Sequence, residues 1–122
     1  MKNILFVGLG GAIGSIARFL ISKWIYDLHP QTFPLGTFLV NIFGCFLIGL
    51  FYAISAKGNY FSPDFRLFLT TGLCGGFTTF SAFAYENIVL LKSGNTNTAL
   101  VYISGSLILC IVGTWLGMML AK

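Results

Sequence analysis

Four long apolar blocks follow one another along the chain, separated by short polar stretches. They cover about 4–26, 35–56, 65–91 and 98–121. Each block is at least as long as the roughly 20 residues that an α-helix needs to cross the hydrocarbon core of a bilayer. The stretches between them contain Pro, Gly, Asn and Ser, which favour turns. The pattern predicts an all-α membrane protein with four transmembrane helices, built as a single integral membrane domain over residues 1–122.

The composition fits this prediction and excludes several kinds of function. Of the 122 residues, 57% are hydrophobic and 8% are charged, whereas about 25% are charged in soluble domains. The blocks leave no room for a separate catalytic domain, so we do not expect an enzyme. The seven Lys and Arg residues are scattered singly, which argues against nucleic acid as a partner. The expected surroundings are a lipid bilayer.

The positive charges give only a weak signal for orientation in the membrane. With four spans, the N-terminal side carries Lys2, Lys57, Arg66 and Lys122. The opposite side carries Lys23 and Lys92, and Arg18 lies part-way along the first block. Short loops rich in Lys and Arg normally stay in the cytoplasm. The charges therefore leave two alternatives open, a single orientation and insertion in both directions.

The third block is unusually polar for a membrane span. It contains Thr70-Thr-Gly-Leu-Cys-Gly-Gly-Phe-Thr-Thr-Phe-Ser81, and both Gly and Thr weaken a helix. Backbone freed from a helix inside a membrane must be buried in protein or line a watery cavity, where carbonyls bind cations and N–H groups bind anions. The alternative is close packing of an intact helix through Gly72 and Gly76. Similar small-residue pairs occur at Gly10/Gly14 and Gly113/Gly117.

Two other blocks carry polar side chains at helical spacing. Asn41 lies in the middle of the second block, with Thr37 and Cys45 one turn to either side. In the fourth block a hydroxyl or thiol recurs at every fourth position: Thr98, Tyr102, Ser106, Cys110 and Thr114. These stripes indicate a polar path, but an interhelical hydrogen bond at Asn41 and a packing seam at Ser106 and Cys110 remain open alternatives.

Phe80 and Phe83 are three residues apart and share a helix face just after the glycine-rich segment. Packing is the default role of such a pair. The functional alternative uses the positive edge of the phenyl ring, which attracts an anion where water is scarce.

Arg18 and Glu86 are the ionisable groups within the predicted spans. Charged groups at this depth are costly and point to a function. Each has a structural alternative, in which the side chain reaches the membrane surface or pairs with polar backbone. In that alternative, Glu86 would reach towards Lys92.

The three cysteines, Cys45, Cys74 and Cys110, all lie inside apolar blocks and share no short spacing. With one histidine in the chain, they form no recognisable zinc motif or disulfide framework. The sequence therefore predicts no metal site made by these side chains.

Three segments together resemble the Fluc (CrcB) family of fluoride channels. They are Gly8-Leu-Gly-Gly-Ala-Ile-Gly-Ser-Ile-Ala-Arg18, Gly36-Thr-Phe-Leu-Val-Asn-Ile-Phe-Gly44, and Gly72-Leu-Cys-Gly-Gly-Phe-Thr-Thr-Phe-Ser-Ala-Phe83 with Glu86. The resemblance covers all four blocks. It implies an antiparallel, dual-topology homodimer in the inner (plasma) membrane. Such a channel exports fluoride ion passively from the cytoplasm and thereby confers fluoride resistance.

The resemblance also implies roles for individual residues. The fluoride pore would be lined by Asn41, Phe80, Phe83, Tyr102 and Ser106. Further pore or vestibule positions would be Arg18, Thr79, Ser81, Glu86 and Cys110. The third helix would be broken near its middle, where the main-chain carbonyls of Gly75 and Thr78 from both subunits hold one structural sodium ion that is not transported. Ala82 and Cys110 depart from the family pattern, in which a hydroxyl residue is usual.

Two other functions compete with a channel. A small multidrug-resistance transporter has a similar length and four spans, but needs an acidic residue in the first span, where the block 4–26 has Arg18 and no acid. A non-transporting structural subunit would use its glycine faces only for assembly.

Overall fold

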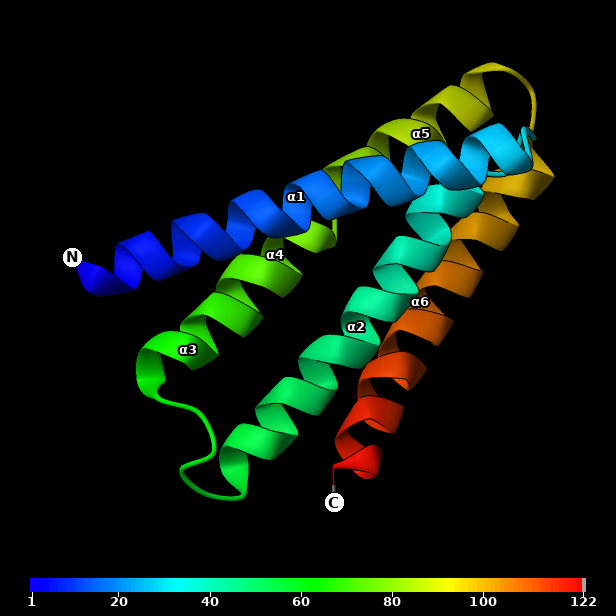
Figure 1. Cartoon of the computed structure of the whole chain (residues 1–122). Coiled ribbons are helices and arrows are strands. Elements are labelled where there is room, and N and C mark those ends of the chain that lie inside the picture. The colour runs from blue at the N-terminus through cyan, green and yellow to red at the C-terminus, as the bar shows by residue number, and fades with distance from the viewer. Residues whose placement is uncertain (122) are drawn as a thin grey trace.

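A computed structural model describes residues 1–121 (Figure 1). Every regular element in that part of the chain is helical: α1 (Lys2–Leu28), α2 (Leu35–Ala56), α3 (Pro63–Leu67), η1 (Phe68–Cys74), α4 (Gly75–Phe77), α5 (Phe80–Lys92) and α6 (Thr96–Leu120). Four stretches are long and apolar enough to cross a membrane, the third being Pro63–Lys92 as a whole. The second has the bounds predicted for it, and the other three begin two residues earlier than predicted.

The spans pack as two pairs. α2 and α6 run side by side in the same direction, and α1 lies against η1 and α4 (Figure 1). Glycines let the backbones approach closely in both pairs. A methyl group at Gly14 would overlap the carbonyl oxygen of Leu73, and one at Gly117 would overlap the carbonyl oxygen of Phe46. The small-residue pairs considered in the sequence are therefore close helix contacts.

The third span is broken, as the first of the two alternatives predicted, and the close packing through its glycines is also present, although the intact helix is not. Thr78 and Thr79 are extended, with ψ of 157° and 120°, and separate α4 from α5. Before the break, a methyl group at Gly76 would lie 2.5 Å from the carbonyl oxygen of Gly11 on α1. The segment η1 is a π-helix, which the sequence did not predict. Such wide turns are rare and often occur near functional sites.

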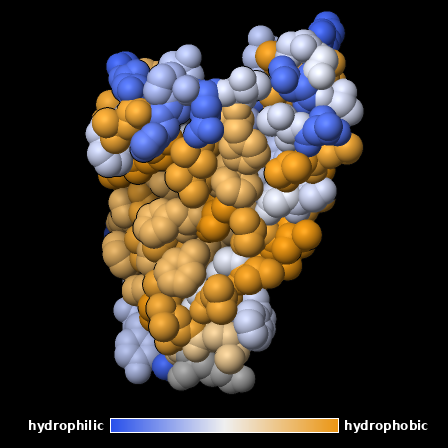
Figure 2. Space-filling model, turned by 90° about the vertical axis from the view of Figure 1, so that its right-hand side faces the viewer, coloured by the Kyte–Doolittle hydropathy of each residue, from blue (hydrophilic) through white to orange (hydrophobic). Residues whose placement is uncertain are grey.

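The surface matches a bilayer. Large apolar side chains are exposed along the spans, among them Phe19, Trp24, Ile111 and Trp115. On the face shown in Figure 2, hydrophobic residues cover the middle of the molecule and hydrophilic ones gather towards its ends. Exposed apolar area of this extent is unfavourable in water and favourable in lipid. The chain is a multi-pass membrane protein.

Candidate functional site

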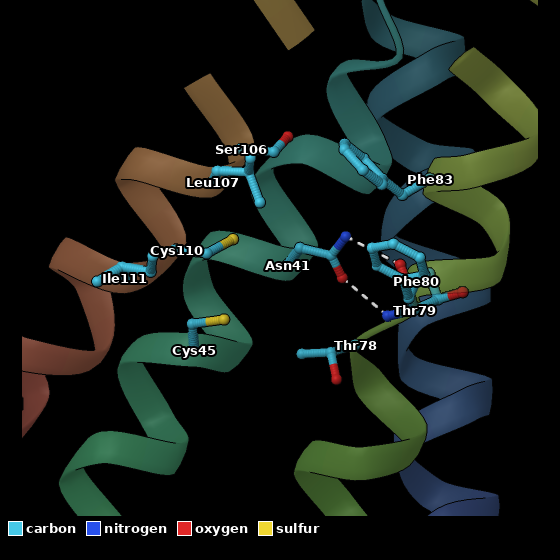
Figure 3. Close-up of a pocket in the computed structure, with 10 residues that line it drawn as sticks. All are labelled: Asn41, Cys45, Thr78, Thr79, Phe80, Phe83, Ser106, Leu107, Cys110 and Ile111. Atoms are coloured by element: carbon cyan, nitrogen blue, oxygen red, sulfur yellow. Dashed lines mark hydrogen bonds between the residues drawn. The ribbon is translucent and has the colours of Figure 1, made fainter. Parts of the chain in front are cut away.

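A cavity of about 250 Å³ lies beside the break, between α2, α6 and the start of α5 (Figure 3). Its wall consists of Asn41, Cys45, Thr78, Thr79, Phe80, Phe83, Ser106, Leu107, Cys110 and Ile111. All of these side chains are uncharged. The fold thus brings together six of the predicted pore or vestibule residues, namely Asn41, Thr79, Phe80, Phe83, Ser106 and Cys110.

Asn41 fastens α2 to the break. Its Nδ2 donates to the carbonyl oxygen of Thr79 at 3.0 Å, and its Oδ1 accepts from the Thr79 N–H at 2.8 Å (Figure 3). The side-chain amide therefore replaces the partners that the Thr79 backbone would have in a continuous helix. The interhelical hydrogen bond considered for Asn41 is present, and one N–H of its amide is left for another acceptor in the cavity.

Arg18 supports the break from the opposite side. Its Nε donates to the carbonyl oxygen of Gly76 at 3.2 Å, and Ser15 Oγ donates to the same oxygen at 3.5 Å. Of the alternatives for Arg18, pairing with polar backbone is confirmed. Arg18 is outside the wall of the cavity. Ser15 was missed in the sequence because a serine in an apolar span is ordinary.

Threonine hydroxyls satisfy other main-chain groups at the break. Thr79 Oγ1 accepts from the N–H of Ala82 at 3.1 Å and so caps the start of α5. Thr78 Oγ1 donates to the carbonyl oxygen of Cys74 at 2.9 Å. Ser81 is exposed and lies 3.2 Å from Thr79 through the two hydroxyl oxygens. Ser81 reinforces the cap and is not part of the cavity wall.

Two carbonyls at the break are left over. Within residues 1–121, none of the hydrogen bonds in the structure ends on the carbonyl oxygen of Gly75 or Thr78. The Thr79 N–H would reach Gly75 in a continuous helix, but it is bound to Asn41. Unpaired carbonyls inside a membrane are costly. They are oxygen ligands available for a hard cation.

The two phenylalanines adjoin each other and differ in exposure. The ring centres of Phe80 and Phe83 are 5.5 Å apart. Phe80 is 75% exposed and Phe83 is 9% exposed. Phe83 packs on Tyr102, with ring centres 4.9 Å apart. Packing accounts for Phe83, but contacts within the chain do not account for the exposed ring of Phe80.

The hydroxyl and thiol side chains predicted to form a polar path along α6 do not all reach the cavity. Ser106 and Cys110 line the cavity, whereas Tyr102 is fully buried behind Phe83 and outside the cavity wall. Ser106 Oγ is buried and has no hydrogen-bond partner among the residues that the structure describes. Buried hydroxyls are normally paired. The one at Ser106 is therefore a free donor at the cavity wall.

Glu86 joins three helices through hydroxyl partners, so the alternative in which it reaches towards Lys92 is not the one that the structure shows. Its Oε2 accepts from Thr37 Oγ1 at 2.8 Å, and its Oε1 accepts from the Tyr102 hydroxyl at 2.7 Å. Two hydroxyl donors offset the loss of water around the carboxylate better than a distant lysine. The sequence contained the signal in separate blocks, since Thr37 and Tyr102 were already part of the polar stripes.

A second cavity of about 260 Å³ lies on the other side of Glu86, where α1 passes into the loop before α2. Its wall includes Ser22, Tyr26, His29, Gln31, Thr32, Thr37 and Glu86. Most of these residues were missed, because a polar loop after a membrane span is ordinary in sequence. Glu86 lines this cavity and Phe83 lines the one beside the break, and Tyr102 contacts both of these residues.

The fold and the site define a class of protein. It is a small multi-pass membrane protein with one broken span and a partly polar cavity lined by phenylalanines. The chain belongs to the CrcB family, described as "CrcB-like protein, Camphor Resistance (CrcB)", which matches residues 5–118. It is 49% identical to the fluoride-specific ion channel FluC of Flavobacterium psychrophilum, over all of this chain and 98% of the relative. Identity to the fluoride-specific ion channel FluC of Phocaeicola vulgatus is 48% over the whole of both chains. For the protein of that name from Geotalea daltonii it is 44%, over all of this chain and 98% of the relative.

Proposed function

We propose that this chain is a fluoride-selective ion channel that lets fluoride leave the cytoplasm passively across the inner membrane. The observation that carries the proposal is the full-length similarity to fluoride-specific ion channels, at 49% identity for the first relative named above. The matched region is the whole chain and therefore covers the segments that form the cavity wall. A channel driven by the electrochemical gradient needs no nucleotide and no catalytic residue, which agrees with the size of the chain.

The cavity supports an anion as the ion that passes. Fluoride holds its water tightly, so a selective path must offer groups that replace this water. The free hydroxyl of Ser106, the remaining N–H of Asn41 and the edge of the exposed Phe80 ring are such groups. All three are neutral, so they compensate for lost hydration without holding the anion too tightly to leave.

We infer that two copies assemble as an antiparallel, dual-topology homodimer. The cavity beside the break is open on one side, and the exposed Phe80 ring stands at its edge. A second copy on this face would enclose the cavity. Labelling of a single cysteine in a loop from outside intact cells is then expected to reach only part of the population. Complete labelling, or none, would contradict dual topology.

A structural sodium ion fits the residues at the break. The leftover carbonyls of Gly75 and Thr78 supply two oxygens per chain, and a two-fold axis would bring four of them together. Oxygen ligands suit a hard cation, and a bound cation would raise the local potential for an anion. We expect thermal stability of the purified protein to fall when Na⁺ is replaced by N-methylglucamine. No ²²Na⁺ should cross with fluoride. Unchanged stability would remove the sodium site, and co-transport would contradict its structural role.

The competing transporter is disfavoured by where the acids lie. The acid within α1 is Asp27, near the end of the helix, where it is exposed and paired with Lys23 at 3.0 Å. It is therefore remote from the mid-membrane position that proton-coupled exchange requires.

The decisive experiment is efflux from proteoliposomes that contain the purified protein alone, with fluoride and chloride measured in parallel. We expect fluoride efflux well above that of protein-free vesicles and little chloride efflux. Absence of fluoride efflux from correctly folded protein would favour the non-transporting structural subunit. Efflux of an organic cation coupled to a pH gradient would favour the multidrug transporter.

A further inference from the structure

Two cysteines from different helices share one wall of the cavity. Cys45 lies on α2 and Cys110 lies on α6, and both side chains line the space beside the break (Figure 3). The third cysteine, Cys74 on η1, is 1% exposed and outside that wall. The cysteines are far apart in sequence, so their spacing gave no hint of this arrangement.

α2 packs along α6, and each of these helices contributes one cysteine to the cavity wall. α2 and α6 run in the same direction, and a methyl group at Gly49 would overlap the carbonyl oxygen of Thr114. Cys45 lies one turn before Gly49, and Cys110 lies one turn before Thr114. One of the close backbone contacts between α2 and α6 thus lies one turn beyond the cysteine pair.

We propose that Cys45 and Cys110 form a binding site for a soft monovalent metal cation of the Ag⁺ or Cu⁺ type. Thiolate sulfur is the ligand that such cations prefer. Residues 1–121 contain no group of three or more His, Cys, Asp or Glu side chains placed to hold a metal. A zinc site with four ligands is therefore absent from this part of the chain, and the pair suits an ion that accepts two ligands in line.

Binding changes both the charge and the space beside the break. Each thiol gives up its proton to solvent when it binds, so two thiolates and one monovalent cation leave a net charge of −1. This charge lies on the same wall as Ser106. A bound cation therefore fills part of the 250 Å³ cavity and repels anions from it. The consequence for fluoride movement rests on the proposed function, whereas the binding itself does not.

The binding test uses purified protein in chloride-free buffer with Ag⁺ as the probe, since fluoride does not precipitate silver. We expect one tightly bound Ag⁺ per chain by native mass spectrometry. Bound Ag⁺ should protect Cys45 and Cys110 together from alkylation by N-ethylmaleimide. Loss of either thiol in Cys45→Ser or Cys110→Ser should weaken binding about 100-fold or more, because the second contact is then lost. Cys74→Ala is the matched control and should bind Ag⁺ as the unaltered chain does.

Two results would overturn the site. One is binding that survives in the double variant Cys45→Ser/Cys110→Ser, and the other is binding that disappears in Cys74→Ala. A variant that fails to bind must elute as folded protein on gel filtration, and Cys45→Ala provides a second substitution if Cys45→Ser does not fold.

The flux test separates this inference from the proposed function. In proteoliposomes, Ag⁺ should reduce fluoride efflux at least tenfold, and excess glutathione should restore it. Each variant is compared with its own efflux before Ag⁺ is added, and Cys45→Ser should be insensitive. If the untreated protein passes no fluoride while Ag⁺ still binds to the pair, the proposed function fails and the metal site stands. If fluoride passes and Ag⁺ blocks it equally in Cys45→Ser, the metal site fails and the channel stands.

Discussion

The two halves of the third span are held in place by different forces. Before the break, η1 and α4 meet α1 through backbone, and glycines at both surfaces leave no room for a methyl group. After the break, side-chain hydrogen bonds hold α5 against α2 and α6. Asn41 on α2 binds the backbone at the start of α5. Further along α5, Glu86 accepts hydrogen bonds from α2 and α6. The first half is therefore sensitive to volume. The second half is sensitive to the loss of polar partners.

The largest effect is expected from adding a methyl group before the break. In Gly10→Ala the new Cβ would overlap the carbonyl oxygen of Phe68, whereas in Gly11→Ala the nearest atom is 4.0 Å away. Forced overpacking costs about 1–3 kcal/mol or more, and here the obstacle is backbone, which cannot rotate aside. Gly10→Ala should give little folded protein on gel filtration, and Gly11→Ala should behave as the unaltered chain. Equal yields of the two variants would show that the contact between Gly10 and the backbone of Phe68 can accommodate an added methyl group.

A smaller but still large effect is expected at the break itself. Asn41→Ala leaves both the N–H and the carbonyl of Thr79 without partners, and each unpaired buried group costs about 1–3 kcal/mol. Thermal stability and fluoride efflux should both fall. Phe80→Ile is the comparison, because the ring is 75% exposed within the chain. It should reduce efflux with a much smaller change in stability. Normal stability of Asn41→Ala would mean that the break holds without this clamp.

A moderate effect is expected at Glu86. The bond to the Tyr102 hydroxyl, at 2.7 Å, should give a coupling of about 1 kcal/mol in a double-mutant cycle of Tyr102→Phe and Glu86→Gln. The control cycle uses Tyr85→Phe, since Tyr85 is exposed on the same helix. That cycle should show no coupling. Similar coupling energies in the two cycles would mean that the hydrogen bond from Tyr102 to Glu86 does not contribute to stability.

The smallest effect on stability is expected at Ser106. Because its hydroxyl is buried without a partner among the described residues, Ser106→Ala should change the free energy of unfolding by less than about 0.5 kcal/mol. Fluoride efflux should nevertheless fall, since a donor is lost from the cavity. Ser104→Ala, on the exposed side of the same helix, is the control for both measurements. A clear loss of stability in Ser106→Ala together with normal efflux would assign the hydroxyl to folding.

The sequence predicted the features that depend on residue type and missed those that depend on main-chain geometry. An amide in the middle of an apolar span marks Asn41 for attention, but its partners are backbone atoms of Thr79, which no pattern displays. Glu86 was recognised as unusual, but the partner considered for it was the nearest charge in sequence, whereas its actual partners are hydroxyls that only the fold brings near. The π-helical turn has no distinct signal in residue type.

The glycine-rich segment combines close packing with a break in the helix. Gly72 and Gly76 allow contact with α1, and the break begins at Thr78, two residues after Gly76. A span fixed firmly by backbone contact can be interrupted directly afterwards without losing its position. The glycines of this segment therefore allow close packing, and the threonines that follow them form the break.

The two-residue break also has an electrical consequence. An uninterrupted helix is one long dipole, positive at its first N–H groups and negative at its last carbonyls. Thr78 and Thr79 divide it, so the negative end of the first half and the positive end of α5 come to lie next to each other in the middle of the membrane. Such ends are otherwise found near the membrane surfaces, where water screens them. One short interruption of the main chain therefore creates adjoining regions that favour ions of opposite sign, and it does so with peptide groups alone.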